Sequence, residues 1–132
     1  MLADEVDYVV GVDTHRDQHV LAIVAAATGA VIAQRSLPTN ARGYAEGVRF
    51  AEAYAPGARI WAVEGAGHYG AGLARFLNAR GELVHESGHS SRAERRLRGK
   101  DDSLDAAGAA RSALASKPAS TYAGSRSCNS AA

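Results

Sequence analysis

The segment that most constrains the fold is the apolar run over residues 8–12 (YVVGV), which ends at Asp13. Its residues are continuously apolar and mostly β-branched, which is typical of a strand buried on both faces. A sheet built around such a strand needs helices over both faces to exclude water. The run therefore predicts a strand over 7–13 inside an α/β sheet.

The hydrophobic period changes once along the chain, near residue 40. Before it the sequence carries strand patterns, and after it helical and strand patterns alternate. The predicted strands cover residues 7–13, 19–24, 31–37, 59–64 and 82–86. Helices are expected from an Asn40 N-cap to Ala55, around Leu73 to Leu77, from Ser91 to Gly99, and over 102–115. The core order is βββαβαβα, with the short helix at 91–99 as an additional element.

This order predicts the topology of the sheet. Three strands with short connections favour an antiparallel meander, and the later alternation favours right-handed parallel crossovers. We therefore expect an α/β fold with a mixed five-stranded sheet, its fourth strand parallel beside the first, and helices on both faces. Residues 1–115 are expected to form one domain. Residues 116–132 are rich in Ser, Ala and Gly without an apolar period, which predicts a disordered tail.

Composition excludes several classes of protein. The 132-residue chain has no run approaching the roughly 18 apolar residues of a membrane span. Its N-terminus lacks a signal-peptide core, and its one cysteine, Cys128, excludes an internal disulfide framework. We expect a cytoplasmic protein without a membrane partner.

Four acidic residues stand where a metal site can form, namely Asp13, Glu64, Asp102 and Asp105. Asp13 and Glu64 end strands expected to be neighbours, about 4.8 Å apart, at the edge where open α/β sheets bind ligands. Asp102 and Asp105 are three residues apart and are expected on one face of the last helix. Close carboxylates repel one another, and Mg²⁺ or Mn²⁺ relieves that repulsion. Two such ions can support phosphodiester cleavage or strand transfer.

Each acid also has a structural interpretation. Asp13 fits a turn, Asp102 fits an N-cap, and Asp105 fits a favourable charge near a helix N-terminus. Glu64 is harder to explain in this way, because it directly follows the apolar residues 60–63. From the pattern alone, both interpretations stay open.

A cluster of basic residues precedes the last two acids. Its cations are Arg92, Arg95, Arg96, Arg98 and Lys100, opposed only by Glu94. Such residues can hold phosphates and position a nucleic acid without reading its sequence. The alternative is a solvated helix face.

Two rival motifs remain. Residues 65–70 (GAGHYG) form a literal G-x-G-x-x-G between a strand and a helix, with Glu86 near the distance of a ribose-binding acid. Against a dinucleotide site, Glu64 places negative charge beside the motif, which also follows the fourth strand rather than the first. Asp13 and Thr14 are also similar to the phosphate-binding turn of actin-like sugar kinases, without its glycines. Within the glycine-rich motif, His68 is expected to pack or face solvent, and Tyr69 to be a turn aromatic.

Three segments together resemble one family. They are residues 10–17 (VGVDTHRD), 63–70 (VEGAGHYG) and 98–106 (RGKDDSLDA), of which the third is the most specific. They resemble the DEDD-type transposases of bacterial insertion sequences, which are relatives of the Piv invertase. The resemblance covers roughly residues 7–115.

The resemblance implies a fold, a chemistry and a set of partners. It implies a RuvC-like domain of the RNase H-like fold, and it maps the metal-binding acids onto Asp13, Glu64, Asp102 and Asp105. It further implies Mg²⁺ or Mn²⁺ as cofactor, DNA as substrate, a structured guide RNA in some members, and a homo-oligomer in full-length proteins. The expected function is metal-dependent DNA cleavage and strand transfer in transposition.

The resemblance also implies a missing part. Family members continue into a helical domain that carries a serine nucleophile, and this chain stops before it. We expect a truncation or frameshift, and a chain that does not transpose alone. A nucleic-acid-binding domain of the same fold that does not cleave remains an alternative, with the dinucleotide-binding domain behind it.

Overall fold

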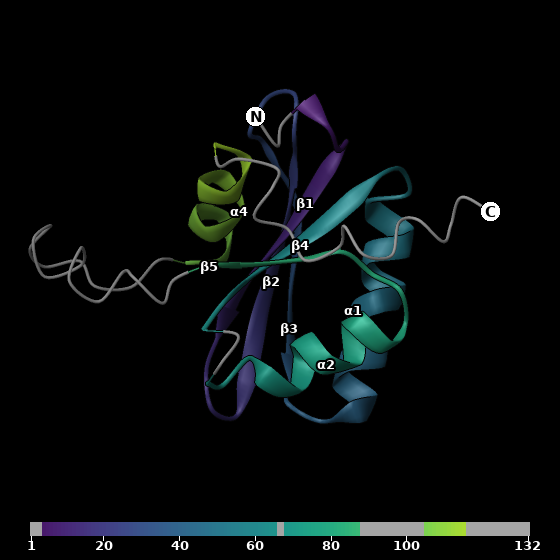
Figure 1. Cartoon of the computed structure of the whole chain (residues 1–132), viewed down its shortest axis with the longest axis vertical. Helices are drawn as coiled ribbons and strands as arrows, with labels where there is room; N and C mark the ends of the chain where they lie inside the picture. The colour runs from purple at the N-terminus through teal and green to yellow at the C-terminus, as the bar shows by residue number, and fades with distance from the viewer. Residues whose placement is uncertain (1–3, 66–67, 88–104, 116–132) are drawn as a thin grey trace, which may run out of the picture.

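The computed structural model describes residues 4–65, 68–87 and 105–115 (Figure 1). Five strands and three helices are defined in this part of the chain, and their labels follow Figure 1. They are β1 (Tyr8–Thr14), β2 (Gln18–Ala25), β3 (Val31–Pro38), α1 (Ala41–Tyr54), β4 (Arg59–Glu64), α2 (Ala71–Ala79), β5 (Val84–Ser87) and α4 (Ala106–Leu114).

The strands form one mixed sheet in the order β3-β2-β1-β4-β5. β1 pairs antiparallel with β2, and β2 pairs antiparallel with β3, so the first three strands form the expected meander. β4 runs parallel to β1, and β5 runs parallel to β4. The predicted sheet, including the fourth strand beside the first, is confirmed.

One face of the sheet is packed with large side chains beneath α1 and α2. Alternate residues of β1, Val10 and Val12, point to this face and are fully buried, as is Trp61 of β4. Asn40 begins α1 as expected, because its side-chain oxygen accepts a hydrogen bond from Gly43 N at 2.8 Å. We call the face beneath α1 and α2 the thick face.

The other face is covered by α4, whose buried residues are mainly alanines. Ala22 and Ala62 from the sheet meet Ala106, Ala107 and Ala110 from the helix. At Gly11, a Cβ atom would collide with the carbonyl oxygen of Ala106 and the backbone of Ala110, so only glycine permits this approach. We call this the thin face. Helices therefore lie on both faces, as predicted (Figure 1).

A polar network holds the start of β4 to the segment before β5. The Arg59 guanidinium donates to both carboxylate oxygens of Glu82, at 3.1 and 2.7 Å. The Trp61 indole N–H donates to the same carboxylate at 2.9 Å. Both charged side chains are largely buried, so Glu82 has a fixed cation and a fixed neutral donor.

Three expectations need comment. The last helix does not run from Asp102, because Asp105 has extended backbone (φ −72°, ψ 178°) and acts as the N-cap of α4, which begins at Ala106. The predicted helix at 91–99 and the predicted tail at 116–132 lie outside the described residues. Across the described ranges, none of the helices has the length and apolarity needed to cross a bilayer.

Candidate functional site

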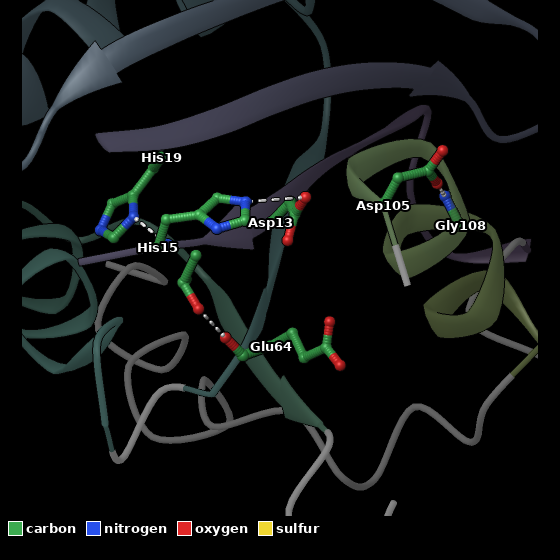
Figure 2. A network of polar contacts seen from close by, with 7 residues as sticks. Asp13, His15, His19, Glu64, Asp105 and Gly108 are labelled. Atoms are coloured by element: carbon green, nitrogen blue, oxygen red, sulfur yellow. Dashed lines mark hydrogen bonds and ion pairs between the residues drawn. The ribbon is translucent and has the colours of Figure 1, made fainter. Parts of the chain in front are cut away.

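Asp13 and Glu64 meet at the carboxyl ends of two adjacent parallel strands. The last paired residues of β1 and β4 are Val12 and Val63, so each acid follows at the same level of the sheet. Side chains alternate along a strand, and Gly11 and Ala62, two residues earlier, face α4. Both carboxylates therefore project on the thin face. In Figure 2 both extend toward the side where Asp105 begins α4.

Asp105 is held at this same end of the thin face by the packing of α4. Its Oδ1 accepts the Gly108 N–H at 2.8 Å, which caps the helix (Figure 2). The close contact of Gly11 with Ala106 fixes the first residue of the helix against β1. The positive end of the helix dipole consequently lies on the side of the sheet where the acids project, which favours negative charge there.

The carboxylate of Asp13 already has a protein partner. Its Oδ2 lies 3.2 Å from Nε2 of His15, and the two side chains are 21 % and 55 % exposed. The backbone N–H of His15 is directed at Gln18 O (3.1 Å) and His19 Nδ1 (3.4 Å). The turn after β1 thus holds an exposed imidazole beside one oxygen of the acid.

His19 supports this turn from the thick face. It is fully buried and stacks on Tyr44 with ring centroids 6.2 Å apart. Burial lowers the pKa of His19, so its ring is neutral near pH 7 and Nδ1 can accept the His15 N–H. Its Nε2 has no hydrogen-bond partner among the described residues.

The donor set fits a hard divalent cation in part. Among residues 4–65, 68–87 and 105–115, no three His, Cys, Asp or Glu side chains group closely enough to hold a metal ion unaided. Mg²⁺ commonly takes one or two protein carboxylates and completes its shell with waters and substrate phosphate oxygens. Asp13 and Glu64 can supply such a pair, and Asp105 retains one carboxylate oxygen outside its cap.

Several predicted site residues lie outside the described part of the chain. Asp102 is one, and the cationic set Arg92, Arg95, Arg96, Arg98 and Lys100 is another. Their roles stay predictions. Asp105 precedes the last helix as its N-cap, so the prediction that Asp102 and Asp105 share one face of that helix is wrong.

The glycine-rich turn after β4 has a backbone held by hydrogen bonds. Gly65 has φ +73°, a conformation that favours glycine, and its carbonyl accepts the N–H groups of His68 and Gly70. The Thr14 hydroxyl donates to the carbonyl of Glu64 at 3.0 Å, so the ends of β1 and β4 are tied together. These glycines have structural roles whether or not a nucleotide binds, and the dinucleotide interpretation stays untested.

The sequence predicted no site role for His15, Arg16 or Tyr69, and Tyr69 was expected only as a turn aromatic. They line an open hollow, together with Asp17 and Gln18, between the turn after β1 and the turn after β4. One sequence feature could have identified them, because both turns directly follow the strand ends that carry Asp13 and Glu64. Isolated residues in turns have no period, so the hydrophobic pattern could not identify them.

Comparison with known families gives one match. The sequence fits the family model of the DEDD transposases of the IS110 type, described as a transposase, over residues 10–129. The curated proteins contain no significant match to the chain. The mixed five-stranded sheet with helices on both faces agrees with the RNase H-like fold of that domain. The match runs past residue 115, where the sequence analysis placed a boundary, and that boundary stays a prediction.

Proposed function

This chain belongs to the IS110-type DEDD transposase family, and on that premise we propose that its carboxylate edge binds a divalent cation and cleaves DNA phosphodiester bonds. The observation that carries the proposal is the placement of Asp13 and Glu64 side by side on the thin face. The family is generally dependent on divalent metals and acts on DNA, which agrees with an all-oxygen donor pair.

The protein residues have separable tasks. Asp13 and Glu64 would hold Mg²⁺ or Mn²⁺, with Asp105 and Asp102 as the further acids that the family resemblance assigns. When bound, such an ion orients a scissile phosphate and stabilises the charge that develops on its oxygens. The positive end of α4 adds a fixed favourable potential on the same side. His15 Nε2 lies 3.2 Å from Oδ2 of Asp13 and can orient that carboxylate.

The basic segment supports the choice of DNA. Its cations lie in the sequence between β5, a strand of the sheet, and α4, the helix that covers the thin face. They are Arg92, Arg95, Arg96, Arg98 and Lys100. We propose that these cations contact phosphates beside the acids. Charge removal at Arg95 and Arg96 should then reduce the salt dependence of DNA binding. A guide RNA and a homo-oligomer remain further proposals from the family resemblance.

The test is nicking of supercoiled DNA by the full chain, with Mg²⁺ or Mn²⁺ and with EDTA. Asp13→Asn and Glu64→Gln should each lower the metal-dependent rate on the order of 100-fold, because each weakens the hold on the cation that would stabilise charge on the reacting phosphate. Glu52→Gln, an exposed change on α1, is the matched control and should leave the rate unchanged. A parallel Mn²⁺ titration should show weaker binding in the two site variants only.

The second candidate is a domain that binds DNA without cutting it. It is favoured by one observation, that Asp105 uses a carboxylate oxygen to cap α4 and completes no three-ligand group in the described residues. DNA binding by the wild-type chain with no metal-dependent nicking would establish this candidate over the first. The same assay, extended to strand transfer, tests the expectation that the chain alone does not transpose.

A further inference from the structure

An open hollow lies at the carboxyl edge of the sheet, between the turns after β1 and β4. It measures about 620 Å³ and is lined by His15, Arg16, Asp17, Gln18 and Tyr69. Ligand pockets in proteins span roughly 300–1,000 Å³, so one nucleotide is within its capacity. His15 belongs both to this lining and to the contact with Asp13, so the hollow adjoins the proposed metal edge.

Tyr69 supplies an exposed aromatic surface to this hollow. The side chain is 49 % exposed although it is large and mostly apolar. The His68 ring meets it edge-on, with centroids 4.7 Å apart and planes at 76°. Hydrogen bonds from His68 N and Gly70 N to Gly65 O fix the backbone on both sides of Tyr69. The ring is therefore held in place before any ligand arrives.

Arg16 supplies a cation to the same hollow. Its side chain is 78 % exposed, and its ion pair with Asp17 is long, at 3.8 Å, between two solvated groups. Such a pair contributes little and does not prevent the guanidinium from taking a phosphate. The carbonyl of Arg16 accepts the Thr39 hydroxyl at 3.0 Å, which ties this turn to the end of β3. The cation thus also comes from a fixed backbone.

We propose that this hollow binds one unpaired nucleotide of the DNA strand, with the base stacked on Tyr69 and a neighbouring phosphate held by Arg16. A stacked aromatic accepts any base, and a guanidinium pairs with phosphate in bidentate geometry. A base inside a duplex has both faces covered, so the hollow selects single-stranded over duplex DNA. The proposal rests on the proposed function for its substrate class and needs no metal.

The test measures binding of a fluorescent single-stranded oligonucleotide and of its duplex to the full chain in EDTA. We expect the wild type to prefer the single strand. Tyr69→Ala should weaken single-strand binding about tenfold, the loss expected for one stacked base, and should leave duplex binding nearly unchanged. Tyr69→Phe keeps the ring and should stay within about twofold of the wild type.

Two matched controls come from α1. Tyr54 is equally exposed, at 47 %, so Tyr54→Ala should leave binding unchanged. Arg16→Gln should weaken binding and reduce its salt dependence, whereas Arg42→Gln, an exposed change on α1, should do neither. Urea unfolding of each variant confirms that the exposed substitutions leave the fold intact.

The outcomes separate this proposal from the proposed function. Loss of single-strand binding in Tyr69→Ala supports the hollow even if the chain never nicks DNA. The proposal is overturned if the wild type does not bind single-stranded DNA, if Tyr69→Ala binds like the wild type, or if Tyr69→Phe is as weak as Tyr69→Ala. It is also overturned if RNA of the same sequence is bound more tightly than DNA through Tyr69.

Discussion

The two faces of the sheet are covered by helices whose buried side chains differ in size. The thick face packs Trp61, Leu21 and other large residues against α1 and α2, from which Leu73 is fully buried, whereas the thin face packs alanines of α4 against Gly11 and its neighbours. Because apolar burial stabilises in proportion to area, the thick face provides most of the stability. The small side chains of α4 bury less apolar area on the thin face, but they allow the helix to lie close to the backbone of β1.

That difference separates stability from positioning. Asp13 and Glu64 project on the thin face, and Asp105 begins the helix that covers it. Large side chains there would move α4 away from the sheet and carry Asp105 with it. A change on the thick face should therefore alter stability first, and a change on the thin face should alter the site first.

The largest effect is expected from Trp61→Ala on the thick face. It removes a fully buried indole and one donor to Glu82, which should lower the free energy of unfolding by about 3–5 kcal/mol. Trp61→Phe should cost less, because most of the volume stays. Urea unfolding followed by circular dichroism measures both, since the chain has no other tryptophan for fluorescence. Equal losses in the two variants would contradict the cavity argument.

A smaller loss of stability, with a larger effect on the site, is expected from Gly11→Ala. The added methyl group meets the backbone of α4, which cannot move locally, so overpacking should cost about 1–3 kcal/mol. Gly47→Ala is the thick-face control, since its methyl meets the flexible end of Leu37 at 2.8 Å and alanine favours helix α1. Nicking should fall in Gly11→Ala beyond its folded fraction, and it should not do so in Gly47→Ala. Similar behaviour of both variants would remove the distinction between the faces.

Asp105 offers a sharper test of positioning. Asp105→Ala removes the cap on Gly108 and should cost about 1 kcal/mol in urea unfolding. Asp105→Asn keeps an oxygen acceptor for that N–H and should leave stability nearly unchanged. If the carboxylate also holds metal, nicking falls in both variants. Full activity in Asp105→Asn would limit the residue to capping.

The smallest effect concerns pH and compares one histidine from each face. Burial lowers the pKa of His19 on the thick face and of His85, which pairs with Ala62 of the thin face, from an ordinary value of 6.5. Below about pH 6.5 these two histidines therefore bind protons more readily in the unfolded chain than in the folded chain. The stability present above pH 6.5 should fall as the pH drops toward the folded pKa.

Urea midpoints at pH 7.5, 6.5 and 5.5 measure this dependence. His85→Gln should reduce the slope without removing it, because His19 remains. A higher midpoint at pH 5.5 than at pH 7.5 in the wild type would contradict the assignment of both imidazoles as neutral.

The sequence carried enough information to predict the sheet and the neighbouring positions of two acids in the candidate site. The sequence showed a strand buried on both faces, then a meander, and then alternating helices and strands. This order predicted that β1 and β4 are neighbours, and hence that Asp13 lies beside Glu64. The predicted start of the last helix at Asp102 was wrong. Asp102 and Asp105 are equally good N-cap residues by type, and the packing of α4 on Gly11 favours Asp105. The fifth strand starts at Val84 rather than residue 82, because Glu82 instead binds Arg59 and Trp61.

The remainder of the site depends on contacts that have no sequence period. The proximity of His15 to Asp13 follows from the hairpin turn, and the hollow beside Tyr69 follows from two turns that are far apart in the chain. Local patterns identify elements, whereas these contacts require the finished arrangement of elements.

The pairing of β1 with β4 also sets the order in which the candidate site can assemble during synthesis. β1, β2 and β3 can form as a hairpin array once the first 38 residues have emerged, but β1 lacks its parallel neighbour until residue 64. The thin face stays uncovered until α4 emerges. Contacts of such sequence separation form late. A nascent chain thus carries Asp13 and Glu64 apart at first, and Asp105 can join their side of the sheet only after α4 has emerged.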